Sequence, residues 1–488
     1  MPRRLIRAGG AAEAAALPEA LRELRTQLGV PDDFPAAVLA EADSAAAAAP
    51  RSPGPDPVDA THLPFFTVDP PGAADLDQAI HLARRDGGGY RVHYAIADVA
   101  AFVTPGGTID SEAHRRVQTL YFPDESVPLH PPVLSAGAAS LLPDGPRPAL
   151  LWRIDLDAEG RTVSADIRRA TVRSRERLDY ATAQRRIDDG TADEPLALLR
   201  TVGRLREERE RERGGVSLGV PEQEIVRRDG GYALGYRAPL PVDGWNAQLS
   251  LLTGMAAADI MIESGTGILR TLPTAPSGAV ARLRLTARAL GVDWPHHVPY
   301  AEVIRSLDPR EPHHAAFLME CTSLLRGAGY AVFTGGRLPD PTVHAAVAHA
   351  YTHCTAPLRR LVDRYTGELC LAARGGQGVP EWILEALADL PATMAQGARR
   401  AATVERECVD IVEAVLLRDR VGETFDGVVI DVREDDPAAG TVQLRDPAVV
   451  ARVTGDGALP LGEPLRVRLT RADPAARPGT ARVLFAPA

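Results

Sequence analysis

The chain has 488 residues, enough for about two to four domains and a large buried core. Hydrophobic residues make up 45% of it and charged residues 25%, which is ordinary for a soluble globular protein, and no apolar run reaches the length of a membrane span. The formal net charge of −10 argues against a surface coated in nucleic acid, although a local basic channel is compatible with it.

The N-terminus and the cysteines indicate a cellular compartment. The first residues are basic and Ala-rich but lack the apolar segment of a signal peptide, so we expect a cytoplasmic protein. Four scattered cysteines, with no C-x-x-C pair, favour buried free thiols over zinc ligation or disulfides.

The chain order predicts an α+β protein of three parts. Residues 1–55 are expected to form a helical segment, where LPEALRELRTQL has helical spacing, followed by a linker where EADSAAAAAP runs into proline and glycine. Residues 56–420 are expected to form a domain of mixed sheets and helices. Residues 421–488 contain five short alternating runs that suggest a small OB-like barrel, a fold that commonly binds single-stranded nucleic acid.

The middle part contains two predicted hairpins and several helices. The first hairpin turns at the glycines of residues 87–89, and the second turns at Glu159-Gly160. A charged helix, LRTVGRLREERERERGG, and an apolar one, WNAQLSLLTGMAAADIMI, follow, and further helices are expected from about 275 to 420.

An acidic segment contains Asp69, Asp75 and Asp77. Asp75 and Asp77 are two residues apart, so in an extended segment their carboxylates project to the same side, and a Pro-Pro-Gly turn can fold Asp69 back toward them. Neighbouring carboxylates repel one another unless a hard cation such as Mg²⁺ or Mn²⁺ lies among them. Such a cluster suits phosphodiester hydrolysis. On spacing alone, solvated aspartates in an acidic loop are the commoner outcome.

A second segment is AYTHCTAPLRRLVDRY. Pro357 suits a turn that enters a helix, so Arg359 and Arg360 are expected in the first helical turn. Because the helix dipole disfavours cations there, two arginines indicate a bound phosphate. His353 and Cys354 have no partner pair and are interpreted as structural or RNA-adjacent.

Five motifs follow one another along the chain: D-P-P-G-A-A-D-L-D-Q-A, H-Y-A-I-A-D-V, T-L-Y-F-P, Y-T-H-C-T-A-P-L-R-R-L-V-D-R-Y and V-E-R-E. In their sequence and order they resemble the exoribonuclease II family, the RNB-domain ribonucleases, over roughly residues 60–420. The first and fourth motifs are specific, and the others gain value from their order.

The resemblance implies a processive hydrolase that degrades single-stranded RNA from its 3′ end to nucleoside 5′-monophosphates. It implies Mg²⁺, with Mn²⁺ as a substitute, and a monomer without an obligate protein partner. Asp69 and Asp75 match metal-holding aspartates, and Asp77 matches the aspartate most closely tied to cleavage. Arg359 matches the arginine that stabilises the phosphate in the transition state.

Other positions match expected RNA contacts. Tyr121 resembles the aromatic residue that stacks on the terminal nucleotide, and Glu405 matches a glutamate that contacts the 3′-terminal ribose. Arg360 is expected to contact RNA beside Arg359. Asp98 is expected either to support the site indirectly or to cap a strand end.

Three features depart from the family. Gln78 replaces a fourth aspartate, so it is expected to ligate metal through its carbonyl with one charge fewer. Thr266 stands where relatives stack an aromatic residue, so the grip on the last bases is expected to loosen by about 1–3 kcal/mol. The N-terminal cold-shock barrels of relatives are replaced by helix and linker.

Gln78 and Thr266 motivate an alternative, a catalytically weakened RNA-binding protein. A further alternative is a metal-dependent phosphodiesterase that acts on another nucleic-acid end.

Overall fold

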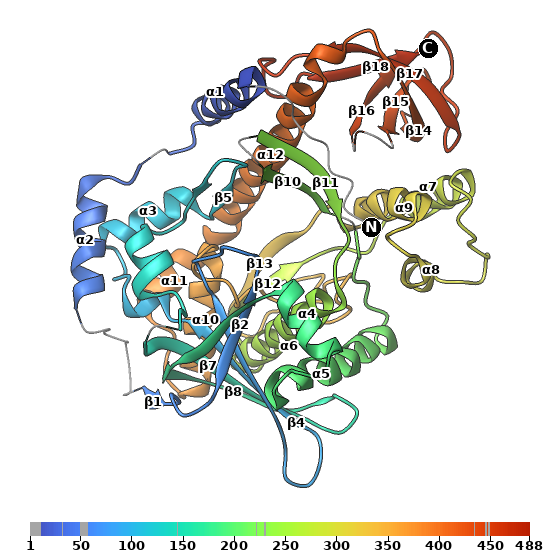
Figure 1. Cartoon of the computed structure of the whole chain (residues 1–488). Coiled ribbons are helices and arrows are strands. Elements are labelled where there is room, and N and C mark those ends of the chain that lie inside the picture. Colours follow the sequence, from blue (N-terminus) through green and yellow to red (C-terminus); the bar gives the residue numbers. More distant parts are fainter. Residues whose placement is uncertain are drawn as a thin grey trace.

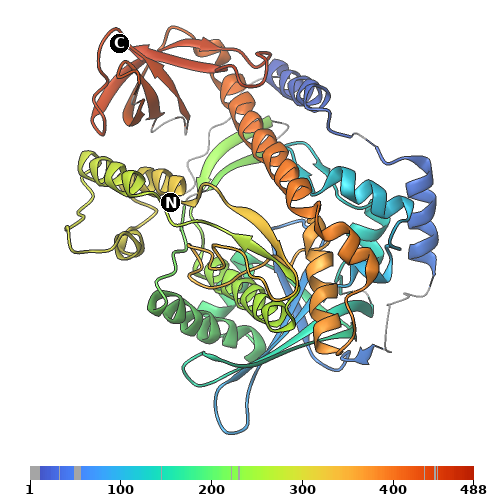
Figure 2. The ribbon, with the colours of Figure 1, turned by 180° about the vertical axis from the view of Figure 1, so that it is seen from behind.

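The structure is a computed structural model that describes residues 11–31, 33–48, 57–143, 145–220, 222–228, 231–433, 435–444, 447 and 449–488. A large α+β body carries a small β-barrel at one end, and a long helix, α12, runs from the body to the barrel (Figure 1). Seen from behind, α12 is the orange helix that crosses the molecule toward the barrel (Figure 2). None of the helices in these ranges combines the length and apolar character that a bilayer crossing requires.

In chain order the helices and short helical turns are α1 (Ala11–Gln27), α2 (Ala36–Ala47), η1 (Val99–Ala101), α3 (Thr108–Arg116), η2 (Leu134–Ala138), α4 (Tyr180–Asp188), α5 (Glu194–Glu212), α6 (Pro241–Ser264), α7 (Ser277–Ala289), α8 (Tyr300–Ser306), α9 (Pro312–Cys321), η3 (Thr322–Leu325), α10 (Leu361–Arg374), α11 (Glu381–Leu387), α12 (Leu390–Leu417) and η4 (Arg418–Arg420). The strands are β1 (Val58–Asp59), β2 (Phe65–Asp69), β3 (Gln78–Arg84), β4 (Tyr90–Ala97), β5 (Leu120–Tyr121), β6 (Ser126–Val127), β7 (Arg147–Leu156), β8 (Thr162–Val172), β9 (Ser174–Asp179), β10 (Glu222–Arg228), β11 (Gly231–Arg237), β12 (Gly267–Thr271), β13 (Gly329–Phe333), β14 (Thr424–Val432), β15 (Ala439–Leu444), β16 (Val450–Thr454), β17 (Pro464–Ala472) and β18 (Val483–Pro487).

A mixed seven-stranded sheet forms the centre of the body, in the order β1-β8-β7-β4-β3-β2-β9. The pairs β3–β4, β4–β7 and β7–β8 are antiparallel, whereas the edge strands β1 and β9 run parallel to their neighbours. Both predicted hairpins are confirmed. The glycines at 87–89 have positive φ, a conformation that glycine adopts without steric cost, and they turn the chain from β3 into β4.

The two faces of the sheet carry different side chains because strand residues alternate in direction. Ile80, Tyr94 and Trp152 face the large core under α5, α6 and α10. Ala79 and Ala95 face a second core to which α2 contributes. The buried apolar helix and the charged helix of the sequence prediction are α6 and α5, and α5 packs along α6.

The N-terminal helices differ in one respect from the prediction. The alanine-rich run interpreted as linker belongs to α2 up to Ala47, because alanine has the highest helix propensity. The Pro- and Gly-containing residues 50–56 lie outside the described residues. The four cysteines are buried free thiols, as predicted.

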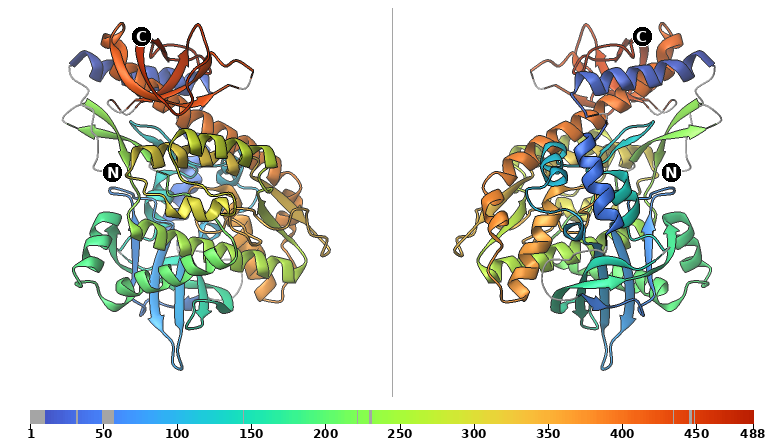
Figure 3. Two further views of the ribbon diagram at one scale, coloured as in Figure 1. Left: turned by 90° about the vertical axis from the view of Figure 1, so that its right-hand side faces the viewer. Right: turned by 90° about the vertical axis from the view of Figure 1, so that its left-hand side faces the viewer.

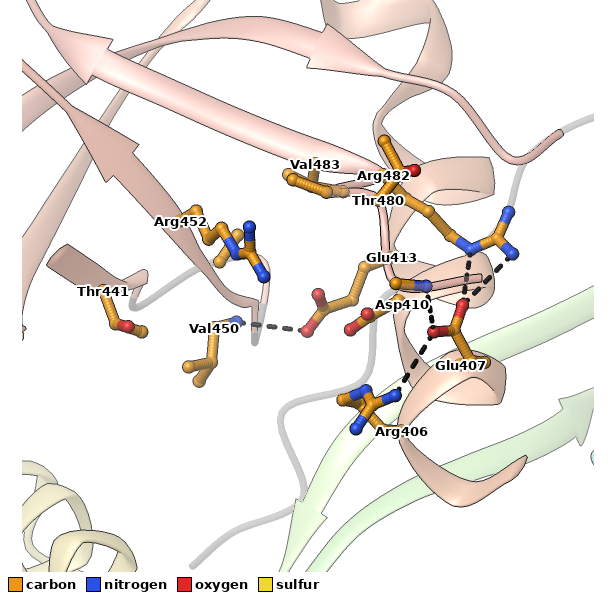
Figure 4. A pocket seen from close by; sticks show the side chains of 13 residues that line it. Arg406, Glu407, Asp410, Glu413, Thr441, Val450, Arg452, Thr480, Arg482 and Val483 are labelled. Atoms are coloured by element: carbon orange, nitrogen blue, oxygen red, sulfur yellow. Dashed lines mark hydrogen bonds and ion pairs between the residues drawn. The ribbon is translucent and has the colours of Figure 1, made fainter. Parts of the chain in front are cut away.

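Strands β14–β18 close into the predicted barrel, in the order β14-β15-β16-β18-β17. Two glutamates of α12 fasten the barrel: Glu407 accepts from Gly479 N–H at 2.8 Å, and Glu413 accepts from Val450 N–H at 3.1 Å. Arg482 of the barrel pairs with Glu407 at 3.2 Å. These contacts surround a pocket of about 280 Å³ (Figure 4). Figure 3 shows the barrel stacked on the body from two sides.

The turn that leaves α3 toward β5 is strained. Val117 has φ 69°, a costly conformation for a β-branched residue. Gly397 of α12 lies against it, and a Cβ placed on Gly397 would stand 2.5 Å from Cγ1 of Val117. The missing side chain at Gly397 therefore lets α12 approach this turn.

Gly397→Ala should destabilise the folded protein by about 1–3 kcal/mol, because the added methyl group overpacks a strained turn. Gly278→Ala in α7 is the matched control: open space surrounds its Cβ position, so it should be neutral or raise stability by up to about 1 kcal/mol. Denaturant unfolding measures both variants. Equal stability of Gly397→Ala and the parent would show that the turn relaxes freely.

Candidate active site

The centre of the site is Asp77, at the end of the acidic segment. Its side chain is almost fully buried, and Oδ1 accepts a hydrogen bond from Leu358 N–H at 2.7 Å. Oδ2 lies 3.3 Å from Nε of Arg359. The two segments that the sequence singled out therefore meet at one buried carboxylate.

The loop that carries Arg359 is fixed through its backbone. Thr119 N–H donates to the Arg359 carbonyl at 3.0 Å, and Leu361 N–H donates to the Val117 carbonyl at 3.0 Å. The Arg359 side chain is nevertheless 46% exposed. Its guanidinium is thus anchored on one side and open on the other, which suits an encounter with a phosphate from solvent.

The prediction that Arg359 and Arg360 lie in the first turn of a helix was wrong. Helix α10 begins at Leu361, Arg359 lies in the preceding turn, and Arg360 is the N-cap residue, with extended φ −138° and ψ 129°. Asp363 explains the difference. Its carboxylate accepts from Ala356 N–H at 2.7 Å and holds Arg360 with two bonds of 2.9 and 2.8 Å.

Arg360 is therefore neutralised by Asp363 within the protein, so its charge does not require a phosphate. The pair fixes the loop beside Arg359. The assignment of Arg360 as an RNA contact stays a prediction.

Asp69 and Asp75 are the other carboxylates of the site. Oδ2 of Asp69 is buried without a hydrogen-bond partner. Burial raises the pKa of Asp69 to about 6, and Asp75 adds to the rise while Arg359 opposes it. Burial raises the pKa of Asp77 to about 8, again with Asp75 adding and Arg359 opposing. Burial and the charge of Asp75 therefore both disfavour ionisation of Asp69 and Asp77, which is the electrostatic condition that a cation relieves.

The chemistry of these donors fits a hard divalent cation, because all are oxygens and one buried oxygen is unsatisfied. Across the described ranges, no group of three or more aspartate, glutamate, histidine or cysteine side chains is arranged to hold a metal ion. The donors fit a metal in kind, but as placed they do not form a closed ligand set. Asp69, Asp75 and Asp77 stay predicted ligands.

Gln78 begins β3, and both ends of its amide are engaged. Nε2 donates to the Thr355 carbonyl at 2.7 Å, and the Tyr94 hydroxyl donates to Oε1. The same hydroxyl lies 3.0 Å from Oγ of Ser250. Gln78 therefore ties β3 to the loop that leads to Arg359. Its role as a metal ligand stays a prediction.

Tyr121 and Glu405 lie on adjacent elements. Tyr121 ends β5, its side chain is 54% exposed, and its hydroxyl lies 3.4 Å from Oδ2 of Asp75. Glu405 is exposed on α12, which packs against β5. The exposed ring beside an acidic site suits contact with a base, although the structure contains no RNA to test either assignment.

The remaining predicted positions lie around this centre. Asp98 is buried and pairs with Arg169 at 3.1 Å, so it joins an ion pair within the body. Burial lowers the pKa of His353 well below its ordinary value, and its Nδ1 lies 2.5 Å from the Tyr330 hydroxyl, which favours the structural interpretation. Thr266 lies between α6 and β12.

The sequence analysis missed two tyrosines of the site. Tyr94 holds Gln78, and Tyr180 lies near Asp69, where burial raises its pKa. For Tyr94 a signal existed: the turn at 87–89 sets a register that pairs Tyr94 with Ile80, diagonal to Gln78 on the same face. For Tyr180 the sequence offers no comparable signal.

The chain matches two known domain families. Residues 58–369 match the RNB domain, and residues 423–488 match the RNase II-type exonuclease C-terminal S1 domain. The chain belongs to the RNB family. This membership confirms the resemblance drawn from the motifs.

Relatives of this chain include proteins named as nucleases. The chain is 27% identical to Ribonuclease R of Escherichia coli (strain K12) over 403 residues, which cover 77% of this chain and 48% of the relative. It is 28% identical to the exosome complex exonuclease RRP44 of Homo sapiens over 338 residues, covering 65% of this chain and 34% of the relative. The chain spans about half the length of the bacterial relative.

Solved structures share the fold. Mycoplasma genitalium RNase R, in complex with ribose-methylated single-stranded RNA, superposes with a TM-score of 0.84 at 19% identity, covering 97% of this chain and 78% of the other. Yeast Ssd1, a pseudonuclease, superposes with a TM-score of 0.65 at 16% identity, covering 87% and 54%. The fold is thus shared by proteins with and without nuclease activity in their names.

Gln78→Glu separates the two roles of Gln78. It keeps the size of the side chain but removes the donor to the Thr355 carbonyl, and an unpaired buried carbonyl costs about 1–3 kcal/mol. We expect a lower Tm at every Mg²⁺ concentration, with Gln377→Glu on the exposed surface as control. An unchanged Tm together with stabilisation at lower Mg²⁺ would instead show that Gln78 acts mainly on the metal.

Asp69→Asn tests the cost of ionising the buried carboxyl of Asp69. The folded pKa of Asp69, about 6, exceeds its unfolded value near 4, so ionising this carboxyl lowers the free energy of unfolding. The loss is absent below pH ~4 and grows as the pH rises to ~6. With a chelator, the variant should therefore melt above the parent at pH 8 and equal it at pH 4. Calorimetry measures both, and equal Tm values at pH 8 would contradict this account. Mg²⁺ should stabilise the parent more than the variant.

Proposed function

We propose that this chain is a divalent-metal-dependent exoribonuclease that degrades single-stranded RNA from the 3′ end and releases nucleoside 5′-monophosphates. Membership of the RNB family and the relatives' names support the reaction class. Mg²⁺ is the proposed metal, with Mn²⁺ as a substitute. The predicted processivity, cytoplasmic location and action as a monomer without an obligate protein partner stay predictions.

The observation that carries this proposal is the meeting of Asp77, Arg359 and their neighbours. A buried carboxylate accepts a backbone N–H and pairs with a half-exposed arginine. A second carboxylate, Asp75, stands within reach of the hydroxyl of an exposed tyrosine, Tyr121. This arrangement combines negative donors for a cation, a positive group for a phosphate and a ring for a base.

Each residue contributes a distinct step. Asp69, Asp75 and Asp77 would hold the cation, which when bound activates water and neutralises charge on the scissile phosphate. Arg359 stabilises the negative charge that develops on the phosphate oxygens, because its guanidinium is already oriented by Asp77. Tyr121 would stack on the last base, and Glu405 would accept the ribose hydroxyls that separate RNA from DNA.

A catalytically weakened RNA-binding protein is the second candidate. The engaged amide of Gln78 and the likeness to the pseudonuclease Ssd1 favour it. The retention of Asp69, Asp75, Asp77 and Arg359 favours the enzyme. Single-turnover kinetics on a short RNA separate these two, and matched RNA and DNA substrates test for a phosphodiesterase of another nucleic-acid end.

The proposal predicts that Asp77→Asn keeps RNA binding while turnover falls by orders of magnitude, because the amide retains the size of the carboxylate but removes its charge. A 5′-labelled single-stranded RNA with Mg²⁺ reports turnover, and fluorescence anisotropy reports binding. Asp86→Asn, in the exposed turn between β3 and β4, is the matched control and should behave as the parent.

Two outcomes would contradict the assignment. A parent protein that releases no mononucleotide with either Mg²⁺ or Mn²⁺ would exclude an active nuclease. A variant at Asp77 with the parent's turnover would remove that residue from the reaction.

A further inference from the structure

The hairpin that carries Tyr121 is small. Strands β5 and β6 each contain two residues, and their pairing is limited to Leu120 with Val127 and Tyr121 with Ser126. An isolated two-stranded hairpin is marginally stable at best. The position of Tyr121 therefore depends on contacts from outside the hairpin.

One such contact comes from the N-terminal helix α1. The guanidinium of Arg25 binds Asp124 in the hairpin turn through two parallel bonds, Nη1 to Oδ1 and Nη2 to Oδ2, each 3.0 Å long. It also lies 3.2 Å from Oε1 of Glu125 and 5.1 Å from the centre of the Phe122 ring. Arg25 is only 7% exposed.

Apolar packing surrounds this ion pair. Leu17, Leu21 and Leu24 of α1 share one core with Leu120 and Phe122 of the hairpin. The same core includes apolar residues of α12: Val404, Cys408, Ile411, Val412, Val415 and Leu416. Figure 1 shows α1 beside the upper part of α12, and the two helices are in contact. Apolar packing alone would let the hairpin turn slide along α1, whereas the bidentate bond between Arg25 and Asp124 fixes its position and orientation.

We propose that Arg25 is a positioning residue that holds Tyr121 at the 3′-terminal nucleotide by fixing the turn of its hairpin. The inference rests on the proposed function, because it needs a nucleotide at Tyr121. Asp124 and Tyr121 are three residues apart in a short hairpin, and the Tyr121 hydroxyl lies 3.4 Å from Asp75. α1 lies outside the matched RNB segment of residues 58–369, so this brace is contributed by a part of the chain that the family domain does not include.

The Arg25–Asp124 ion pair contributes more to the geometry of the hairpin turn than to the net free energy of folding. A largely buried arginine gains little stability from its partner once the loss of hydration is counted, but the pair has one preferred geometry. Removal of Arg25 frees the turn, whereas loss of the Asp124 carboxylate breaks the bidentate bond but leaves Arg25 with Glu125 at 3.2 Å. Changes at the two ends should therefore give the same kind of functional defect, smaller at Asp124.

The first experiment reads the position of the terminal base directly. In an Asp77→Asn background, a short RNA with 2-aminopurine at its 3′ end reports stacking by fluorescence quenching. Arg25→Met should reduce the quenching and weaken binding roughly tenfold, the size of one charge-assisted hydrogen bond. Asp124→Asn should have a smaller effect in the same direction, because the amide oxygen still accepts one bond and Glu125 remains beside Arg25. Arg25→Lys, which keeps the charge, should also retain more of both.

The second experiment reads turnover in the otherwise intact protein. Arg25→Met should raise KM for RNA roughly tenfold with kcat changed less than about threefold, because the lost contact acts on binding of the substrate end. Arg22→Met is the matched control, on the exposed side of the same helix, and should equal the parent.

The outcomes separate this inference from the proposed function. Quenching and KM that stay at the parent's values, with or without a lower Tm, would overturn the role of Arg25. If Arg25→Met does not fold, Asp124→Asn decides the same question, because the Asp124 side chain is already 20% exposed. A parent protein that releases no nucleotide would overturn the proposed function, while the fluorescence measurement would still report whether Arg25 places Tyr121 against a bound RNA end.

Discussion

The site depends on one buried carboxylate that joins segments 281 residues apart in the chain. Asp77 accepts the N–H of Leu358 and pairs with Arg359, so the acidic segment and the arginine loop hold each other in place. A carboxylate buried in this way is costly unless it is hydrogen-bonded and its charge compensated, which is why its pKa rises to about 8 despite Arg359. The Asp77–Arg359 pair thus joins two segments of the fold, and the buried Asp77 carboxylate is a group whose ionised form a cation would stabilise.

Around this contact, hydrogen bonds hold the backbone of the Arg359 loop, while the side chains of Arg359 and Tyr121 remain accessible to solvent. The strand that leads to Tyr121 bonds to the loop of Arg359, and Asp363 and Gln78 hold the rest of that loop. The guanidinium of Arg359 and the ring of Tyr121 stay about half exposed. A rigid support with accessible functional groups is the arrangement that orients a substrate without reorganisation.

Much of this architecture was predictable because it follows from local pattern. Alternating residues and glycine turns predict the hairpins and the barrel, whereas the spacing of Asp69, Asp75 and Asp77 alone favoured solvated aspartates and gained weight only from the order of the other motifs. The start of α10 was misjudged because Asp363, three residues after Arg360, binds the N–H of Ala356 in the preceding loop and turns that arginine inward. Tyr180 lies near Asp69, Arg25 binds the distant Asp124, and Val117 has a positive φ beside Gly397, so no local pattern indicates these features.

The most direct test of the account is a crystal structure of the chain with Mn²⁺ and a short RNA that has a non-hydrolysable 3′-terminal linkage. Anomalous scattering locates the metal, and the electron density locates the RNA end. The account predicts Mn²⁺ bound by Asp69, Asp75 and Asp77, with the last phosphate beside Arg359. Mn²⁺ bound elsewhere, or an RNA end bound away from Arg359, would contradict it.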